Sequence, residues 1–167
     1  MRRFAIVGHR ALSFGKLPLN DLAGAAGRMD VLIRALMASL MTSHGFRRDT
    51  EIILHLYGPP GPQRRIKIIG NEVRGIHAEE RSVAGQLAKI LREPVPAIGH
   101  WIERSPGIWD CGGELDDSIK EWHDSTIIAL DANAERLWKN DPNVKESVKL
   151  KPNNIDISFI LSDDKPL

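Results

Sequence analysis

Three charged side chains lie close together in this sequence and could act on an anionic substrate: Arg28, Asp30 and Arg34. A guanidinium group can hold a phosphate through two parallel hydrogen bonds, and a carboxylate can orient an N–H group or accept its proton. We therefore predict a site in which Arg28 and Arg34 bind substrate phosphates and Asp30 acts on the reacting group. The simpler alternative is an ion pair on a helix surface between Asp30 and Arg34, worth about 0.3–0.5 kcal/mol.

Two further groups of cations follow. Arg47 and Arg48 come directly before an apolar run. They could clamp a phosphate or, alternatively, complement the negative end of the preceding helix. Arg64, Arg65 and Lys67 lie on the predicted hairpin, at the start of its second apolar run. They could contact nucleic acid or simply form a solvated strand edge.

The charge distribution also indicates a polyanionic partner. Residues 1–92 hold 15 Lys and Arg against 7 Asp and Glu, whereas residues 93–167 hold 8 against 15, although the formal net charge is only +1. Such asymmetry is typical of a cationic face that binds RNA or DNA. If the two halves interleave in the fold, however, their charges neutralise each other.

Several classes of protein are disfavoured. The single cysteine, Cys111, excludes an internal disulfide and a cysteine-rich zinc site, and the six histidines show no metal-binding spacing beside a carboxylate. A dinucleotide-binding glycine motif, a P-loop and a nucleophile elbow are all missing. The apolar run at 4–8 is too short for a secretory signal, and no stretch approaches the roughly 20 apolar residues that span a bilayer. We expect a soluble, cytoplasmic protein without a metal.

A long helix must position the first group of charged residues. We predict it over residues 22–43, ended by Gly45, because apolar residues recur there at spacings of three and four. This apolar stripe consists of Leu22, Ala25, Ala26, Met29, Leu32, Ile33, Leu36, Met37, Leu40 and Met41.

The remaining elements alternate between strands and helices. Strands are expected at 3–8, 51–57, 66–69, 105–109, 126–130 and 155–161, and helices at 77–92 and 114–123. The proline-rich segment 58–62 turns the second strand into the third as a hairpin, the strand at 126–130 is expected to be buried, and residues 139–154 form a polar connection. The chain, 167 residues long, is predicted to be a single α/β domain with a mixed, mostly parallel sheet flanked by helices.

A series of short blocks along nearly the whole chain carries a family resemblance. The blocks are Asp21-Leu22, Gly27-Arg28-Met29-Asp30, Ser43-His44, Arg47-Arg48-Asp49, Leu56-Tyr57-Gly58-Pro59, Ile66-Lys67-Ile68, Gly70-Asn71-Glu72-Val73, Glu79-Glu80-Arg81, Ser105-Pro106-Gly107-Ile108 and Phe159-Ile160-Leu161-Ser162-Asp163. Together they resemble the TrmY family, the archaeal tRNA pseudouridine N1-methyltransferases of the SPOUT superfamily.

This resemblance implies S-adenosylmethionine-dependent methylation of pseudouridine 54 in the T-loop of tRNA, by a homodimer and without a metal. Asp30, assisted by Arg28, would orient the N1–H group of the base or take its proton. By the same resemblance the tRNA-binding residues are Arg34, Arg47, Arg48, Arg64 and Arg65. The residues expected to line the cofactor are Leu130, Ser162 and Asp163.

The sequence departs from the family near its end. Ser162 stands where the family has glycine, and Asp163-Asp164 stands where it has Asp-His. The family continues with a cofactor loop and a terminal helix that close a trefoil knot, whereas this sequence stops at Leu167. We therefore expect a SPOUT-like domain that is truncated or shortened, and a knot only if the tail is present.

Two alternative functions remain open at this point. If the chain is complete as given, we expect weak or absent binding of S-adenosylmethionine, which calorimetry would test. The protein would then be an inactive RNA-binding or heteromeric partner protein of the SPOUT fold. The other alternative is a SPOUT methyltransferase that acts on a different RNA.

Overall fold

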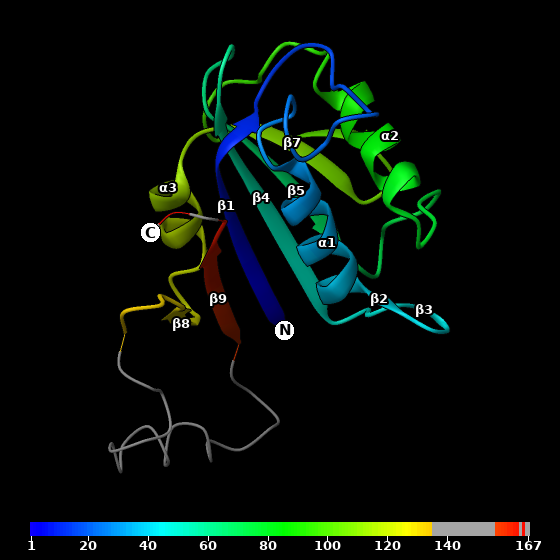
Figure 1. Ribbon diagram of the computed structural model, residues 1–167. Helices are drawn as coiled ribbons and strands as arrows, with labels where there is room; N and C mark the ends of the chain where they lie inside the picture. The colour runs from blue at the N-terminus through cyan, green and yellow to red at the C-terminus, as the bar shows by residue number, and fades with distance from the viewer. Residues whose placement is uncertain (135–155, 164, 166–167) are drawn as a thin grey trace.

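The computed structural model describes residues 1–134, 156–163 and 165 (Figure 1). Its frame is a seven-stranded sheet in the order β6-β7-β5-β4-β1-β9-β8, with a separate two-stranded hairpin, β2-β3. The strands are β1 (Arg2–Leu12), β2 (Met41–Thr42), β3 (Gly45–Phe46), β4 (Thr50–Gly58), β5 (Arg64–Ile69), β6 (Ile102–Ser105), β7 (Ile108–Gly112), β8 (Thr126–Ala129) and β9 (Ile157–Ser162). The helices are α1 (Met29–Leu40), α2 (Glu80–Ile90) and α3 (Leu115–Glu121). The expected mixed α/β sheet flanked by helices is confirmed.

Strand β1 lies inside the sheet and pairs in parallel with both β4 and β9, and β8 adds to β9 in parallel. Strands β5, β7 and β6 extend the other side in antiparallel pairs. Five strands, β1, β4, β7, β8 and β9, therefore end in the same direction. We call the side of the sheet where they end the carboxyl edge, and the opposite side the amino edge.

The helices cover the sheet on both faces (Figure 1). Leu32 and Leu36 of α1 and Leu87 of α2 belong to one buried cluster with alternate residues of β4, including Leu54. A smaller cluster on the other face joins Ala5, Ile53 and Ile160 to Trp122, with Leu115 and Ile119 of α3 packed against it. Alternation of side chains along each strand accounts for the two clusters, because both faces of this sheet are covered.

Helix α1 is shorter than predicted at both ends. It begins at Met29 rather than at residue 22, because Gly27 and Arg28 have φ angles of +66° and +68°, which a right-handed helix cannot accommodate. It ends at Leu40, since the next residues form the β2-β3 hairpin instead of a last helical turn capped by Gly45. The apolar stripe is nevertheless buried at Leu22, Ala26, Met29, Leu32, Ile33, Leu36 and Leu40, whereas Ala25 is exposed and Met37 and Met41 are half-buried.

Two strand predictions also need correction. The strand expected at 105–109 is a hairpin of two strands, β6 and β7, because Pro106 and Gly107 form the turn between them. Strand β8 was expected to be buried but lies at the end of the sheet, and its residues are half-buried or exposed. The other predicted elements are confirmed within a few residues of their bounds. The polar connection at 139–154 falls outside the described residues, within which no helix is long and apolar enough to cross a membrane.

The basic and acidic halves of the sequence do interleave. Arg64 pairs with Asp110, Arg65 with Glu121, and Arg3 with Asp124 and Asp156. Each of these pairs joins a cation from the first half of the chain to a carboxylate from the second. Part of the charge asymmetry of the sequence is therefore neutralised inside the fold.

The Arg64–Asp110 pair is the most deeply buried of these contacts, with both side chains fully covered. Arg64 donates from Nε and Nη2 to the two oxygens of Asp110, at 2.7 and 2.6 Å. It also donates to the carbonyl oxygens of Ser13 and Ile90, at 3.1 and 2.8 Å. Arg64 therefore ties β5 to β7, to the end of α2 and to the segment after β1.

We predict that Asp110→Ala lowers the free energy of unfolding by about 3–5 kcal/mol, because it leaves the Arg64 guanidinium buried without its counter-ion. Asp49→Ala is the matched control, since it removes the exposed partner of Arg2 and should cost less than about 1 kcal/mol. Urea denaturation of both variants measures the difference. Equal effects would show that burial does not strengthen the Arg64–Asp110 contact.

A second buried polar group lies on β4. His55 is fully buried, and neither ring nitrogen has a hydrogen-bond partner among the described residues. Burial, reinforced by the positive charge of Arg65, lowers the pKa of His55 to about 3. The unfolded chain binds a proton at this histidine well before the folded protein does, so stability falls as the pH drops below about 6.5.

We therefore expect His55→Leu to remove part of the acid sensitivity of the fold. Each pH unit between the two pKa values corresponds to about 1.4 kcal/mol. The stability of the variant relative to the wild type should therefore increase by about 2–3 kcal/mol between pH 7 and pH 4.5. Urea denaturation across that range measures it, with the exposed His123 changed to Leu as the control. A constant difference between variant and wild type would refute this assignment.

Candidate functional site

A close approach of two backbone segments brings the start of α1 to the end of β1. A Cβ atom at Gly27 would lie 1.7 Å from the carbonyl oxygen of Arg10, so only glycine fits there. The amide of Leu12 also donates to the carbonyl of Ala26, at 3.4 Å. The residues that follow Gly27 are thereby held at the carboxyl edge of the sheet.

Arg28, Asp30 and Arg34, which we call the Asp30 cluster, lie together at this position. The Nε group of Arg28 donates to one carboxylate oxygen of Asp30 at 3.1 Å, and the Nη2 group of Arg34 donates to the other. The Asp30 side chain is 14% exposed, against 35% for Arg28 and 62% for Arg34. Arg28 is also the one non-glycine residue with a positive φ in the part of the chain that the structure describes. Such strain is often found at functional sites.

The arginines keep Asp30 ionised. Burial alone raises the pKa of its carboxyl, but hydrogen bonds and positive charge from Arg28 and Arg34 outweigh this, so that the pKa lies below its ordinary value. A carboxylate whose pKa is lowered in this way accepts a hydrogen bond from an N–H group readily. It is a weak base, however, and therefore a poor acceptor of the proton itself. The ion pair between Asp30 and Arg34, given as the simpler alternative, is confirmed, and Arg28 contacts the same carboxylate. The roles in binding and catalysis expected of the three residues stay predictions.

Arg47 and Arg48 do not join this cluster. They lie between β3 and β4 at the amino edge, and the length of β4, about 30 Å, separates this edge from the carboxyl edge. The backbone amide of Arg47 donates to the Leu40 carbonyl at 2.7 Å, so this residue lies beside the end of α1, and the expected complement to the helix dipole stays a prediction. Their side chains form no ion pair within the described part of the chain, and Arg48 is exposed.

Arg64 and Arg65 were expected to bind RNA, and the structure corrects this. Both side chains are fully buried. Arg65 donates to Glu121 at 2.9 Å and lies over the ring of Trp101, 4.8 Å from its centroid. Both residues lie on β5, an interior strand of the sheet, and they bind carboxylates of the second half of the chain.

The three residues expected at the cofactor lie along the carboxyl ends of β8 and β9. Leu130, which follows β8, is 45% exposed, and its amide donates to the Ile160 carbonyl at 2.9 Å. Ser162 is half-buried and donates to the Lys165 carbonyl. The side chain of Asp163 is fully covered, so it offers no free surface to a ligand. Leu130 and Ser162 fit a cofactor site at this edge, whereas the Asp163 carboxylate does not fit as a direct contact.

Asp163 contacts His9, a residue that no motif or spacing in the sequence marks. One oxygen of Asp163 accepts the backbone amide of His9 at 2.9 Å, and the other lies 3.0 Å from His9 Nδ1. The His9 ring also meets Tyr57 edge to face, with centroids 6.2 Å apart. His9 and Asp163 are separated by 154 residues, so no spacing rule connects them. Only the pairing of β1 with β9 brings them together.

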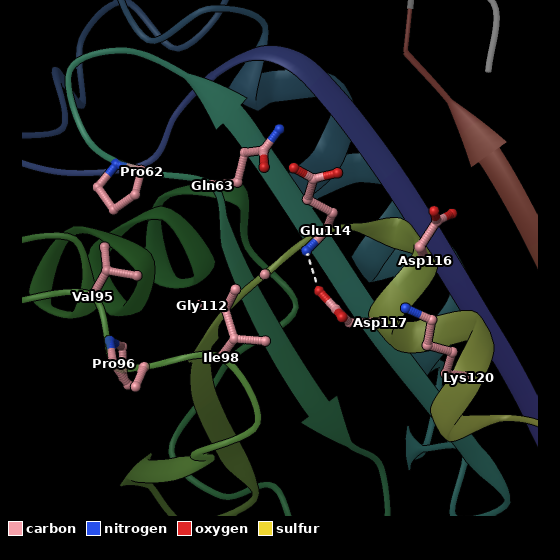
Figure 2. Close-up of a pocket in the computed structure, with 12 residues that line it drawn as sticks. Pro62, Gln63, Val95, Pro96, Ile98, Gly112, Glu114, Asp116, Asp117 and Lys120 are labelled. Atoms are coloured by element: carbon pink, nitrogen blue, oxygen red, sulfur yellow. Dashed lines mark hydrogen bonds between the residues drawn. The ribbon is translucent and has the colours of Figure 1, made fainter.

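A cavity of about 410 Å³ lies apart from these groups (Figure 2). It is lined by Pro62, Gln63, Val95, Pro96, Ala97, Ile98, Gly112, Gly113, Glu114, Asp116, Asp117 and Lys120. Figure 2 shows Asp117 accepting the amide of Glu114, a contact that caps the start of α3. Because three carboxylates and one lysine line this cavity, it does not suit a polyanionic ligand.

The similarity to known proteins extends over nearly the whole chain. A family model described as "Putative SAM-dependent RNA methyltransferase" matches residues 1–165. A protein of Methanocella arvoryzae is 38% identical over 167 residues, which cover 100% of this chain and 80% of the relative. A protein of Halobacterium salinarum is 44% identical over 143 residues, 85% of this chain and 70% of the relative. Both relatives are named tRNA (pseudouridine(54)-N(1))-methyltransferase, which confirms the resemblance found in the sequence.

Proposed function

Because this chain belongs to that family of SAM-dependent RNA methyltransferases, we propose that it methylates N1 of pseudouridine 54 in tRNA. The observation that carries the proposal is the match over residues 1–165, together with relatives of that name at 38% and 44% identity. The structure supports it by placing an ionised carboxylate between two arginines at the carboxyl edge, where open α/β sheets bind their ligands.

S-adenosylmethionine, the cofactor of the family, supplies an electrophilic methyl group when bound. Leu130 and Ser162 would hold it beside the ends of β8 and β9. The exposed Leu130 side chain suits an aromatic base, and the Ser162 hydroxyl suits a polar group of the cofactor. The protein's main task is then to position the reacting nitrogen, since alignment of two reactants supplies much of the acceleration in such transfers.

The Asp30 cluster would orient the target base. Pseudouridine differs from uridine in presenting a free N–H at N1, and an ionised carboxylate accepts a hydrogen bond from that group. Arg28 and Arg34 hold the carboxylate in place from both sides and leave guanidinium surface for backbone phosphates. The cluster therefore combines recognition of the N–H group with binding of the RNA backbone.

Arg47 and Arg48 would bind the RNA at a second, separate position. About 30 Å lies between the two edges of the sheet, a distance that a folded tRNA spans easily. These residues would bind phosphates without reading the base, so their contribution to affinity should fall steeply with rising salt. We also carry over from the resemblance a homodimer acting in the cytoplasm, which light scattering and fractionation would test.

The proposed reaction can be tested with two tRNA transcripts that differ only in carrying pseudouridine or uridine at position 54. We expect N1-methylpseudouridine to form in the first transcript and no methylation in the second, measured by mass spectrometry of the nucleosides. Calorimetry with S-adenosylmethionine accompanies the assay. Methylation of ribosomal RNA instead of tRNA would show that the enzyme acts on a different RNA. Binding of tRNA without any methylation would show that the protein binds RNA but is not a methyltransferase.

We further predict that Asp30→Ala reduces methylation at least 100-fold and leaves the fold intact. The carboxylate that orients the N–H group is lost, whereas a surface ion pair of this kind contributes at most about 1 kcal/mol to stability. Affinity for tRNA should be unchanged or higher, because Arg28 and Arg34 lose their counter-ion. Methylation rates measure the activity, filter binding measures the affinity for tRNA, and circular dichroism measures whether the fold is intact.

Glu80→Ala is the matched control for this variant, since Glu80 is an exposed carboxylate in the first turn of α2. It should methylate tRNA at the wild-type rate. Unchanged turnover by Asp30→Ala would remove Asp30 from the reaction.

A further inference from the structure

We propose that His9 accepts the proton that leaves N1 of the pseudouridine, and that Asp163 is the positioning residue that holds His9 ready to do so. The inference rests on the proposed function, because it assigns the proton of that same reaction. It gives a role to two residues from opposite ends of the chain, one of which belongs to none of the motifs found in the sequence.

The contacts of Asp163 fix the orientation of the His9 ring. The carboxylate is fully covered and receives both the backbone amide and the Nδ1 side of His9, at 2.9 and 3.0 Å. An ionised carboxylate can only accept hydrogen bonds, so Nδ1 must carry a hydrogen. In the neutral ring, Nε2 then has a free lone pair.

The His9 ring is also accessible. Its side chain keeps 23% exposure, so part of the ring meets solvent, and the proposal requires that Nε2 belongs to this part. Tyr57 packs against the ring edge to face and limits its rotation. A buried carboxylate that orients a partly exposed imidazole is an arrangement found in general bases.

The geometry places this base at the substrate's edge of the sheet. His9 directly precedes Arg10, whose carbonyl oxygen packs on Gly27, and Gly27 directly precedes the Asp30 cluster. Ser162 lies on the other side, with its hydroxyl 3.4 Å from His9 Nδ1. His9 therefore lies at the same edge of the sheet as the Asp30 cluster and next to Ser162, with its ring beside Tyr57 on the face that α3 covers.

The two candidate proton acceptors at this edge are chemically unequal. Asp30 is held as a carboxylate by two arginines, and protonating it would break both of its ion pairs. Protonating His9 instead creates an imidazolium beside the buried Asp163 carboxylate, which stabilises the new charge. Asp30 is therefore suited to hold the N1–H group while the base docks, and His9 to take over this hydrogen when the methyl group is transferred.

The step balances with no additional reactant. N1 of the base forms a bond to the methyl carbon while the bond from that carbon to the sulfonium sulfur breaks, and the electron pair of that bond stays on sulfur. The N1 proton passes to Nε2 of His9, so that the positive charge lost from sulfur reappears as the imidazolium. Solvent then takes the proton and restores the neutral ring.

Several ionisable groups surround His9 and enter any pH dependence. Asp163 faces it from the end of β9, Tyr57 from β4, and Arg10 is its neighbour in β1. Burial raises the pKa of Tyr57, whose hydroxyl oxygen accepts the Leu115 amide at 2.8 Å, so it stays protonated. Glu114, Asp116 and Asp117 act on Tyr57 from the start of α3.

The decisive variant is His9→Asn. An asparagine amide can take the place of Nδ1 and keep the hydrogen bond to Asp163, but it has no group equivalent to Nε2. We expect methylation to fall by about 10²–10⁴-fold, the range for loss of a general acid or base, with wild-type binding of tRNA and S-adenosylmethionine. The pH dependence of the rate should differ between the wild type and the variant, because only the variant should gain rate in alkaline solution, where hydroxide removes the proton.

Nitrogen-15 spectra of the protein give a readout that does not depend on activity. Above neutral pH, His9 should carry its hydrogen on Nδ1 in the wild type, and Asp163→Asn should lose this preference. His123→Asn, at an exposed histidine near the amino edge, is the control and should keep the wild-type rate and pH profile. If the contact between His9 and Asp163 is purely structural, His9→Asn should also keep the wild-type rate and pH profile, and that result would overturn the proposal. Absence of methylation by the wild type would instead contradict the proposed function, whereas a hydrogen on Nε2 in the wild type would contradict only the role of His9.

Discussion

Parallel pairing of β1 with both β4 and β9 is the constraint on which the arrangement of this molecule depends. Strand β1 begins at residue 2, and its two partners begin at residues 50 and 157, so both pairings close long loops. Parallel strands end on the same side, and their ends therefore collect residues that are distant in sequence. His9, Tyr57, Leu130 and Ser162 reach the carboxyl edge for this single reason, and the Asp30 cluster is held there by the Gly27 contact with Arg10.

The six arginines predicted from the sequence to act on RNA divide into three groups with different physical roles. Arg64 and Arg65 are buried counter-ions of Asp110 and Glu121, and they link the sheet to the loops and helices around it. Arg28 and Arg34 are partly exposed and hold a carboxylate in place. Arg47 and Arg48 lie at the other edge without an ion pair among the described residues. A count of basic residues therefore overstates the surface that is open to RNA, because the first group faces inward.

Two carboxylates at the carboxyl edge illustrate how surroundings assign different tasks to the same chemical group. Asp30 lies between two guanidinium groups that are themselves accessible to a ligand, so the carboxylate and its partners form a binding surface. Asp163 is covered and receives hydrogen bonds from His9 and from the backbone amide of Lys165, and the ring of His9 is partly exposed. In both cases burial opposes ionisation and hydrogen bonds from the partner overcome it, so the pKa lies below its ordinary value. The difference between them lies in which partner meets solvent.

The sequence by itself determined the α/β class, the positions of most strands and helices, the buried stripe of α1 and the neighbourhood of Arg28, Asp30 and Arg34. These features follow from local periodicity or from spacings within one helical turn, and the family resemblance also depends only on the order of residues. The start of α1 was misjudged because an apolar pattern continues through Gly27, and the pattern does not report a positive φ. Only the tertiary structure decided that Arg64 and Arg65 point inward, that Arg47 and Arg48 lie about 30 Å from the carboxyl edge, and that His9 meets Asp163. Each of these depends on which strands pair and in what register, and contacts across 50 to 150 residues leave no periodic trace in the chain.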